Sequence, residues 1–342
     1  MDTFVQEAIM NKRHRFSGVP AALLLSVLIL LAGCAGQKTV QEPGPAAAPA
    51  REPIQEKAPA AAPTHEQAAP PTAAARDTLS LWKVSSGGNT IYLLGSLHLL
   101  TLEDYPLDER FEEAYERVDT VVFETDLDAL ESPDVLGLTR DRVMYDDGRT
   151  LDEVLPADLY AILVEHCGRM GLSVDQFKSF RPWFVSMTLT TLHIMLMGYN
   201  PYLGIDQHFY DRAKADGKDI GALEAPEYQI SLLTSFSELD QEALLRETLL
   251  ELEQLDVIME EIHAAWQTGD LEAMDLLNQS MREFPTIYKT LVTDRNTAWV
   301  ERIAEYLEQG KDFLVIVGAA HMAGSDGLIE LLRVRGYEVG RY

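Results

Sequence analysis

Residues 90–98, Thr-Ile-Tyr-Leu-Leu-Gly-Ser-Leu-His, constrain the fold more than any other stretch of the chain. Residues 313–321, Phe-Leu-Val-Ile-Val-Gly-Ala-Ala-His, repeat the pattern near the other end. Each is a run of aliphatic and β-branched residues without alternation, which is typical of a strand buried on both faces. The glycine allows a sharp turn off the strand end. The two patterns therefore predict His98 and His321 just past the carboxyl edge of a sheet, where open α/β folds place their ligands.

Residues 1–34 have the character of a lipoprotein signal peptide. A basic segment that begins at Met10, the expected start, precedes an apolar run at 19–31. A basic start, a short apolar core and a small-residue cleavage site are typical of a secretory signal, and the run is shorter than the ~20 residues of a bilayer span. Its end, Leu-Ala-Gly-Cys, resembles the bacterial lipobox. We therefore expect Cys34 to be acylated and to hold the protein on a membrane.

The residues after Cys34 bear on where the protein is located and where its folded domain begins. Ala35 stands where an aspartate would retain a lipoprotein at the inner membrane, so resemblance to enterobacterial sorting rules predicts the periplasmic face of the outer membrane. Residues 35–76 are rich in alanine and proline and cannot build a core, which predicts a disordered linker before a domain at 77–342.

The net charge of the whole chain argues against a nucleic-acid partner. The formal net charge of −27 in 342 residues leaves no positively charged surface for nucleic acid.

The domain pattern predicts an α/β (α+β) fold. Its centre is a mixed, mostly parallel sheet with an antiparallel N-terminal hairpin, flanked by helices and a large helical insertion. The hairpin follows from the turn signal Gly87-Gly88-Asn89. The helix at 181–197 is expected in the core rather than in a membrane, because it is short and carries several hydroxyl side chains. The expected strands are 79–84, 90–94, 119–124, 219–224, 313–317 and 337–339, the insertion is 129–200, and long acidic amphipathic helices are expected at 239–269 and 271–291.

Four expected strands end in groups that carry chemistry. They are followed by His98, Glu124, Glu224 and His321. If the sheet is mostly parallel, all four side chains lie at one edge. Imidazole together with carboxylate suits Mn, Co, Zn or Fe and is a poor match to Mg or Ca. A bound metal would lower the pKa of water and polarise a carbonyl, with the spare carboxylate as general base.

A metal-free alternative stays open at this point. Histidine and glutamate could act as acid and base, with Arg295 stabilising an oxyanion. Nucleophile-elbow, His-Glu-x-x-His, Walker and dinucleotide-binding patterns are absent from the sequence. Either chemistry therefore depends on the two Gly-x-x-His motifs.

Six ordered motifs carry a resemblance to a known family. They are Gly95 with His98, Glu124, Gly204 with Asp206, Leu223-Glu224 with Gln229, Arg295-Asn296 ahead of a helix with Trp299, and Gly318 with His321 followed by Met-Ala-Gly. On these motifs residues 79–342 resemble the TraB/GumN family, whose superfamily also contains the TIKI Wnt-inactivating proteases. Ser96 departs from the family pattern, which has threonine more often.

The resemblance implies metal-dependent peptide-bond hydrolysis. His98, Glu124 and His321 would hold the metal, and Glu224 would be the base or a fourth ligand. Arg295 and Asn296 would orient the substrate or stabilise the oxyanion, Asp206 would support them, and Gln229 would contact the substrate. The leading hypothesis is a lipid-anchored metallohydrolase acting on a peptide or protein. A non-enzymatic lipoprotein that sequesters a peptide, metal or haem ligand is the alternative, and a structural envelope protein is the third.

Overall fold

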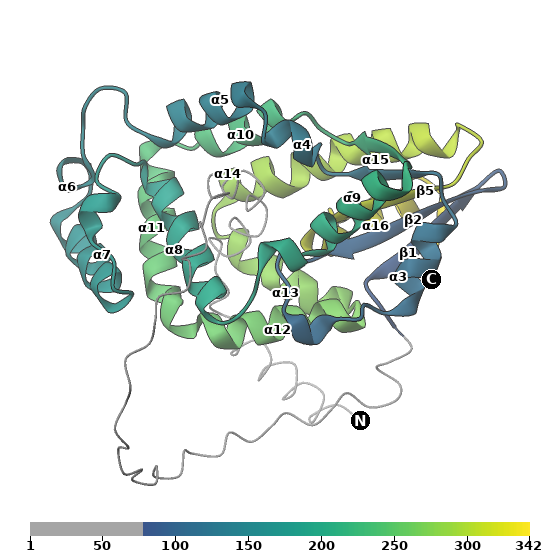
Figure 1. Ribbon diagram of the computed structural model, residues 1–342, viewed down its shortest axis with the longest axis horizontal. Coiled ribbons are helices and arrows are strands. Elements are labelled where there is room, and N and C mark those ends of the chain that lie inside the picture. The colour runs from purple at the N-terminus through teal and green to yellow at the C-terminus, as the bar shows by residue number, and fades with distance from the viewer. Residues whose placement is uncertain (1–77) are drawn as a thin grey trace, which may run out of the picture.

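The computed structural model describes residues 78–342. The predicted signal peptide, Cys34 and the Ala/Pro-rich linker lie outside the described residues. The described part is one mixed sheet with helices on both of its faces and a large group of further helices beside it (Figure 1). This arrangement confirms the predicted fold class.

The sheet has six strands in the order β4-β3-β5-β2-β1-β6. β2, β3, β4 and β5 run parallel to one another, whereas β1 pairs antiparallel with both β2 and β6. The mostly parallel sheet with an antiparallel N-terminal hairpin is therefore as predicted. The strands are β1 (Leu81–Ser86), β2 (Asn89–Ser96), β3 (Thr120–Phe123), β4 (Asp219–Ala222), β5 (Phe313–Gly318) and β6 (Glu338–Arg341).

The hairpin between β1 and β2 fixes the register of the N-terminal edge. Ser86 lies opposite Asn89, so the loop consists of Gly87 and Gly88. Both glycines have positive φ angles, 59° and 99°, which other residues adopt at a cost. Two-residue hairpin loops need this backbone to match the twist of the strands. The turn signal in the sequence therefore predicted the loop correctly.

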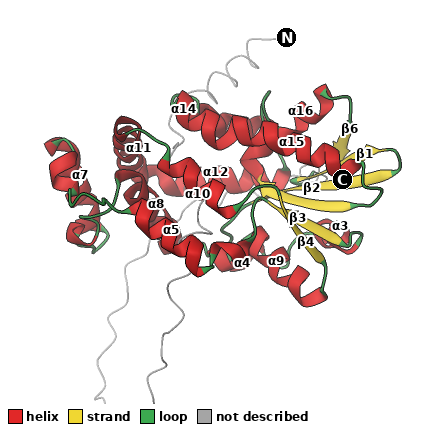
Figure 2. Ribbon diagram, turned by 90° about the horizontal axis from the view of Figure 1, so that it is seen from above, coloured by secondary structure: helices red, strands yellow, loops and turns green. Residues whose placement is uncertain are grey.

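Helices lie on both faces of the sheet (Figure 2), and an apolar cluster fills the space on each face. Alternate residues of β5 face opposite sides: Leu314 and Ile316 join one cluster, and Val315 and Val317 join the other. This alternation with no polar face explains why the strand reads as a continuous apolar run. Helices α3 (Glu109–Glu116) and α9 (Ile205–Asp216) cover the first face, and α15 (Asp294–Leu307) and α16 (Leu328–Val334) cover the second.

The helical insertion comes in two parts, one after β3 and one after β4. Helix α8 packs against α11 and α12 and buries Trp183, Val185 and Leu189, which confirms that it belongs to the core. Among residues 78–342, no helix is long and apolar enough to cross a membrane. The helices are α4 (Leu127–Leu130), α5 (Pro133–Val143), α6 (Leu151–Val154), α7 (Ala157–Arg169), α8 (Pro182–Leu196), α10 (Pro226–Thr234), α11 (Glu238–Glu251), α12 (Leu255–Thr268), α13 (Leu271–Met281) and α14 (Pro285–Tyr288).

The two long acidic helices expected at 239–269 and 271–291 are each divided in the structure. Leu252–Gln254 forms a short 3-10 turn between α11 and α12, and the flanking Leu252 and Leu255 are both buried. Tertiary packing thus decides this break, because neither glycine nor proline marks it. Pro285 opens α14, and Lys289–Thr293 continues as a π-helix directly into α15. The expectation that Arg295 and Asn296 precede the helix was therefore wrong: both lie in the first turn of α15.

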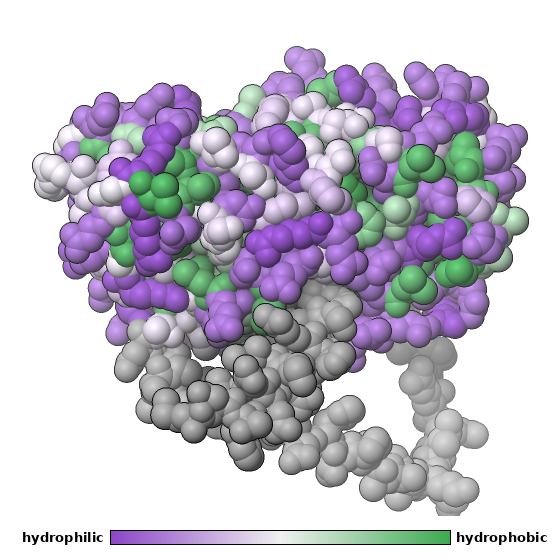
Figure 3. Space-filling model, turned by 180° about the vertical axis from the view of Figure 1, so that it is seen from behind, coloured by the Kyte–Doolittle hydropathy of each residue, from purple (hydrophilic) through white to green (hydrophobic). Residues whose placement is uncertain are grey.

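The face of the molecule shown in Figure 3 is mostly hydrophilic. Figure 3 shows hydrophobic side chains in small separate groups among hydrophilic ones on the face that it presents. Single apolar residues scattered over a surface are normal for a folded domain. The site described next is instead buried, at the end of the sheet that faces the helical insertion (Figure 1).

Candidate active site at the carboxyl edge of the sheet

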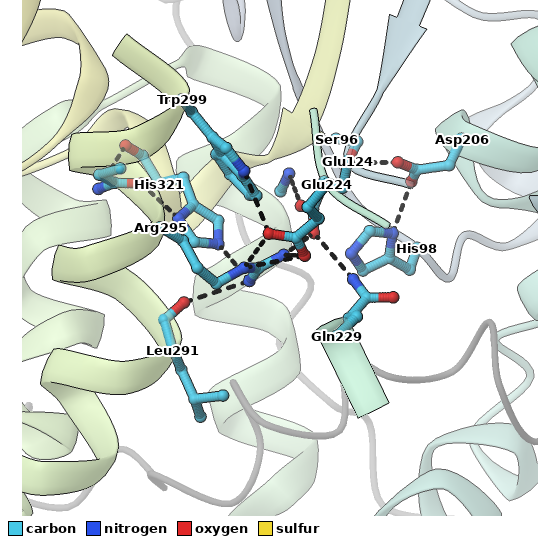
Figure 4. Close-up of polar contacts among 12 residues, drawn as sticks. Ser96, His98, Glu124, Asp206, Glu224, Gln229, Leu291, Arg295, Trp299 and His321 are labelled. Carbon is cyan, nitrogen blue, oxygen red and sulfur yellow. Dashed lines mark hydrogen bonds and ion pairs between the residues drawn. The ribbon is translucent and has the colours of Figure 1, made fainter. Parts of the chain in front are cut away.

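Four functional side chains meet at the carboxyl edge of the parallel strands, as the sequence predicts. β2, β3, β4 and β5 end next to or close before His98, Glu124, Glu224 and His321. All four residues belong to parallel neighbours, so their strand ends share one edge. Figure 4 shows the two carboxylates lying between Arg295 on one side and His98 on the other.

Gly318 shows how closely these groups approach one another. A Cβ atom built on this glycine would lie 3.3 Å from Glu124 Oε1, 3.6 Å from His321 Cδ2 and 3.7 Å from His98 Nε2. The bare backbone at residue 318 thus borders three predicted site residues at once. The backbone of Gly318 is in an ordinary extended conformation (φ −49°, ψ 132°), so the turn does not require glycine here, and what the missing side chain provides is space beside the three site residues.

Asp206 orients His98. The His98 Nδ1 atom lies 2.6 Å from Asp206 Oδ2, and both side chains are buried. The other carboxylate oxygen, Oδ1, accepts a hydrogen bond of 3.1 Å from Ser96 Oγ. Ser96 is the last residue of β2 and His98 lies two positions later, in the bend after the strand, and both side chains reach the same carboxylate. We assign the proton of neutral His98 to Nδ1, because a carboxylate accepts and does not donate.

Gly204 allows Asp206 to reach this position. It precedes α9, and a Cβ atom there would lie 2.2 Å from the backbone oxygen of His98. The amide of Ile205 donates a 3.0 Å hydrogen bond to Leu97 O and ties α9 to the turn after β2. The Gly-x-Asp motif therefore has a physical reason: any side chain at residue 204 would separate the helix from the histidine.

The remaining ring nitrogen of His98 has no partner among residues 78–342. In the described part of the chain, His98 Nε2 is buried and has no hydrogen-bond partner. Burial is the largest single influence and lowers the pKa of His98, but the charge and the hydrogen bond of the Asp206 carboxylate together with the charge of Glu124 outweigh it, so the net pKa lies above its ordinary value. A neutral His98 with its proton on Nδ1 carries its lone pair on Nε2. This arrangement is that of a general base held by a carboxylate.

Arg295 binds both strand-end glutamates. Its Nη2 donates to Glu124 Oε2 at 2.5 Å and to Glu224 Oε1 at 2.8 Å, and its Nε lies 3.2 and 3.1 Å from the two Glu224 oxygens. Its Nη1 donates to Leu291 O at 3.2 Å and to His321 Nε2 at 3.1 Å. A guanidinium has five N–H groups, so all of them are engaged. Arg295 would have to release a partner before it could contact a substrate.

The two glutamates respond differently to their surroundings. Burial raises the pKa of Glu124, but Arg295 is the largest of the influences that lower it, and the net pKa is below its ordinary value. Its Oε1 accepts a 2.8 Å bond from the Gly318 amide. For Glu224 burial prevails over the Arg295 charge, and the pKa is raised. Glu124 is thus the more strongly ionised of the pair.

His321 is held neutral between Asn296 and Arg295. Asn296 Nδ2 donates to the backbone oxygens of Asp326 at 2.7 Å and of His321 at 3.4 Å. Its Oδ1 therefore faces His321 Nδ1, at 2.6 Å, and accepts the imidazole proton. His321 Nε2 consequently accepts from Arg295. Burial and the Arg295 charge lower the pKa of His321 to about 3, so it is not a proton acceptor at neutral pH.

Several site residues had no role assigned from the sequence. Trp299 donates from Nε1 to Glu224 Oε2 at 3.2 Å, and the Arg295 guanidinium lies 4.4 Å from its ring centroid. Trp299 is four positions after Arg295, so the helical period could have indicated a shared face. Ser96 could have been found from its i, i+2 relation to His98. Nothing in the sequence indicated the contact with the Leu291 carbonyl, because the direction of this carbonyl depends on the π-helix before α15. Gln229 does lie at the site, with Nε2 3.5 Å from Glu124 Oε2.

The arrangement does not fit the expected metal ligands. His98, Glu124 and His321 were predicted to hold Mn, Co, Zn or Fe, but Arg295 already occupies Glu124 Oε2 and the lone pair of His321 Nε2. Of the three expected ligands, only His98 has its ligand atom, Nε2, without a hydrogen-bond partner in the described part of the chain. Within residues 78–342, no three His, Cys, Asp or Glu side chains are grouped so that they could hold a metal ion. A cation bound by the three predicted ligands would have to displace a buried guanidinium.

Comparison with known proteins gives the family. Uncharacterized protein YbaP of Escherichia coli (strain K12) is 24% identical over 252 residues, which cover 72% of this chain and 89% of that protein. Metalloprotease TIKI2 of Danio rerio is 23% identical over 302 residues, 72% of this chain and 57% of its own length. Metalloprotease TIKI1 of Danio rerio is 23% identical over 300 residues, 72% of this chain and 60% of its own length. No solved structure gave a significant match. A model described as the TraB/PrgY/gumN family matches residues 80–341, and the chain therefore belongs to this family.

Proposed function

We propose that this protein is a hydrolase that cleaves peptide bonds, with His98 as the general base. The observation that carries the proposal is the Asp206–His98 pair, whose 2.6 Å contact leaves a buried Nε2 without a partner at the strand edge. Similarity to two proteins named metalloproteases supports peptide-bond hydrolysis as the reaction class. The similarity is distant, so the reaction rests on the site as well as on the relatives.

The reaction needs one base and one water molecule. His98 Nε2 takes a proton from water as the water oxygen forms a bond to the carbonyl carbon of the substrate. The carbon–nitrogen bond then breaks, and the proton on Nε2 passes to the departing amine. Asp206 holds the ring in the tautomer that this transfer requires and stabilises the imidazolium that forms.

The other site residues shape the place where the substrate reacts. Glu124 is fixed by Arg295 and by the Gly318 amide, and its Oε1 borders the same space as His98 Nε2. Arg295 and Asn296 have their donors engaged, so we assign them positioning roles in place of the oxyanion contact expected from the sequence. Gln229 has a second amide N–H and is our candidate for a direct substrate contact. No step is assigned to a metal. Two of its three expected ligands, Glu124 and His321, are hydrogen-bonded to Arg295, and only His98 Nε2 has no partner in the part of the chain that the structure describes.

We further propose that the enzyme is held in the cell envelope by an acyl chain on Cys34. The Leu-Ala-Gly-Cys end of the apolar segment supports this attachment, and the 35–76 linker would let the domain work away from the bilayer. The expected location is the periplasmic face of the outer membrane. A Cys34→Ser variant should fail to incorporate labelled palmitate and should leave the membrane fraction. Palmitate labelling equal to that of wild type would remove the anchor from the proposal.

The hydrolase proposal is tested with a peptide library and the full-length chain. Wild type should convert substrate with many turnovers per molecule, and His98→Gln should lose this activity while keeping its fold. His166→Gln, on α7 away from the strand edge, is the matched control and should retain activity. Stoichiometric capture of a peptide without cleavage would instead favour the binding-protein alternative. Equal activity in wild type and His98→Gln would refute the assignment of the base.

A further inference from the structure

The position expected for a metal ion already contains a positive charge that belongs to the chain. The Arg295 guanidinium lies 2.5 Å from Glu124 and 2.8 Å from Glu224, and its side chain is 1% exposed. These carboxylates come from neighbouring strands, β3 and β4, and both face the same planar group (Figure 4). A bidentate guanidinium–carboxylate contact is among the strongest charge-assisted hydrogen bonds in proteins. The two carboxylates therefore already share a cation.

The surroundings hold this guanidinium in place. Its Nη1 donates to the Leu291 carbonyl, which the π-helix before α15 presents to it. One face of the guanidinium lies over Trp299, at 4.4 Å from the ring centroid. π-Helical turns are rare and occur often at functional sites. Arg295 is therefore fixed in one position by a backbone carbonyl, an aromatic ring and two carboxylates.

A metal ion would compete for the same atoms. His321 Nε2 offers a single lone pair, and Arg295 Nη1 occupies it at 3.1 Å. Glu124 has one oxygen on Arg295 and the other on the Gly318 amide. In the predicted set only His98 Nε2 has no hydrogen-bond partner among the described residues. The lone pairs that remain on the Glu124 carboxylate lie next to the fixed positive charge of Arg295, which would repel a divalent ion bound there. One free ligand beside a like charge is a poor cation site.

We propose that Arg295 takes the place of a metal ion in this protein, so that the wild-type site works without a bound divalent cation. The inference rests on the proposed hydrolase function and specifies how its carboxylates are neutralised. It has a converse. Without Arg295, the carboxylates of Glu124 and Glu224 and the Nε2 atom of His321 are released together, beside the His98 Nε2 atom that has no partner in the described part of the wild type. Imidazole and carboxylate ligands suit Mn, Co, Zn and Fe, so Arg295→Ala should create the metal site that the wild type lacks.

The test is metal binding, measured separately from hydrolysis. Wild-type protein is purified without chelator, its Mn, Co, Zn and Fe are quantified by mass spectrometry, and Mn²⁺ titrations are followed by electron paramagnetic resonance. Wild type should retain far less than one metal per chain. Arg295→Ala should bind Mn²⁺ at least about tenfold more tightly, the factor that corresponds to 1.4 kcal/mol. The added affinity should vanish in Arg295→Ala/His321→Ala.

Matched variants separate this effect from a general loss of charge. Arg282→Ala releases Asp275 and Asp326, which Arg282 contacts at 2.5 and 3.5 Å, but no histidine lies in that group, so Mn²⁺ binding should stay at the wild-type level. Arg295→Gln removes the charge and keeps amide donors. It serves as the second metal-binding variant, because Arg295→Ala leaves two carboxylates buried without a partner and could unfold.

Two results would overturn the inference. The first is a stoichiometric metal in wild type that His98→Ala or His321→Ala removes. The second is a folded Arg295→Ala or Arg295→Gln protein that binds Mn²⁺ no better than wild type. Neither result bears on whether peptides are cleaved, because turnover of the library is scored without reference to metal content. A metal-free protein that cleaves no peptide would refute the hydrolase proposal and leave Arg295 as the cation of a binding site.

Discussion

Replacing Asp206 by asparagine removes one charge from the contact that orients His98. The contact is 2.6 Å long and lies between side chains that are 1% and 3% exposed. A hydrogen bond to a charged group is worth about 1.5–3 kcal/mol, or about 10- to 150-fold in rate. The substitution should also change the tautomer. Ser96 Oγ donates to Oδ1 of residue 206, which directs the new amide nitrogen at His98 Nδ1.

The amide then donates where the carboxylate accepted. His98 Nδ1 must become the acceptor, so the proton moves to Nε2 and the base loses the lone pair that accepts the proton from water. The same substitution in a Ser-His-Asp triad lowers kcat by about 10⁴-fold for this reason. We therefore expect kcat/KM of Asp206→Asn to fall by between about 10²- and 10⁴-fold, with thermal stability close to that of wild type.

The pH profile checks the cause. Burial alone lowers the pKa of His98, and the Asp206 carboxylate is the largest influence that raises it. In wild type, kcat/KM should rise as the pH passes upward through this raised pKa, because the base must be neutral. In Asp206→Asn the rise should move to lower pH and reach a lower plateau. Asp211→Asn, an exposed site on the same helix, is the control. An unchanged plateau in Asp206→Asn would refute the role of the His98–Asp206 pair.

Three further predictions concern the packing around the site and one buried acid. Gly204→Ala places a Cβ 2.2 Å from His98 O and should lower the free energy of unfolding by about 1–3 kcal/mol in urea titrations; an unchanged midpoint would contradict the close approach. Gly318→Ala puts a methyl 3.7 Å from His98 Nε2, so kcat should fall about 10²-fold at near-normal stability, and full activity would contradict a reaction next to Gly318. Glu251 on α11 is buried, and burial, with Glu247 and Glu283, raises its pKa to about 9. Because the folded state binds this proton more tightly than the unfolded state, the stabilisation is complete below the unfolded pKa of about 4.3 and is lost as the pH rises toward 9. Glu251→Gln should flatten this decline in chemical denaturation from pH 5 to 9, and an identical slope in both proteins would contradict the buried acid.

The sheet and its edge could be predicted because their signals are local. The runs at 90–94 and 313–317 are apolar on both faces, and the structure places both in the centre of the sheet. The expected sharp turn at the glycines is not found: Gly95 lies inside β2, Gly318 is the last residue of β5, and neither has a positive φ angle. The parallel pairing then brings His98 and His321 to the same edge without any long-range information beyond the fold class.

The network around Arg295 could not be predicted in the same way. Its contacts join residues separated by 171 positions for Glu124 and 71 positions for Glu224. Its orientation depends on a π-helical segment at 289–293, and the amphipathic pattern there indicated an ordinary helix. Imidazoles and carboxylates at one edge indicate a metal. Only the side-chain geometry reveals that Arg295 donates hydrogen bonds to His321 Nε2 and to the carboxylates of Glu124 and Glu224. The sequence correctly predicted that His98, Glu124 and His321 lie close together. It did not predict that Glu124 and His321 are hydrogen-bonded to Arg295.

In the proposed reaction His98 activates water for attack on a peptide bond. Hydrolysis in water enriched in oxygen-18 tests this claim most directly, with the full-length protein, a cleaved peptide from the library and mass spectrometry of the products. Wild type should place one heavy oxygen in each new carboxyl terminus at the first turnover, and His98→Gln should yield no labelled product. Cleavage without incorporation of the label, or labelled product formed by His98→Gln at the wild-type rate, would contradict the account.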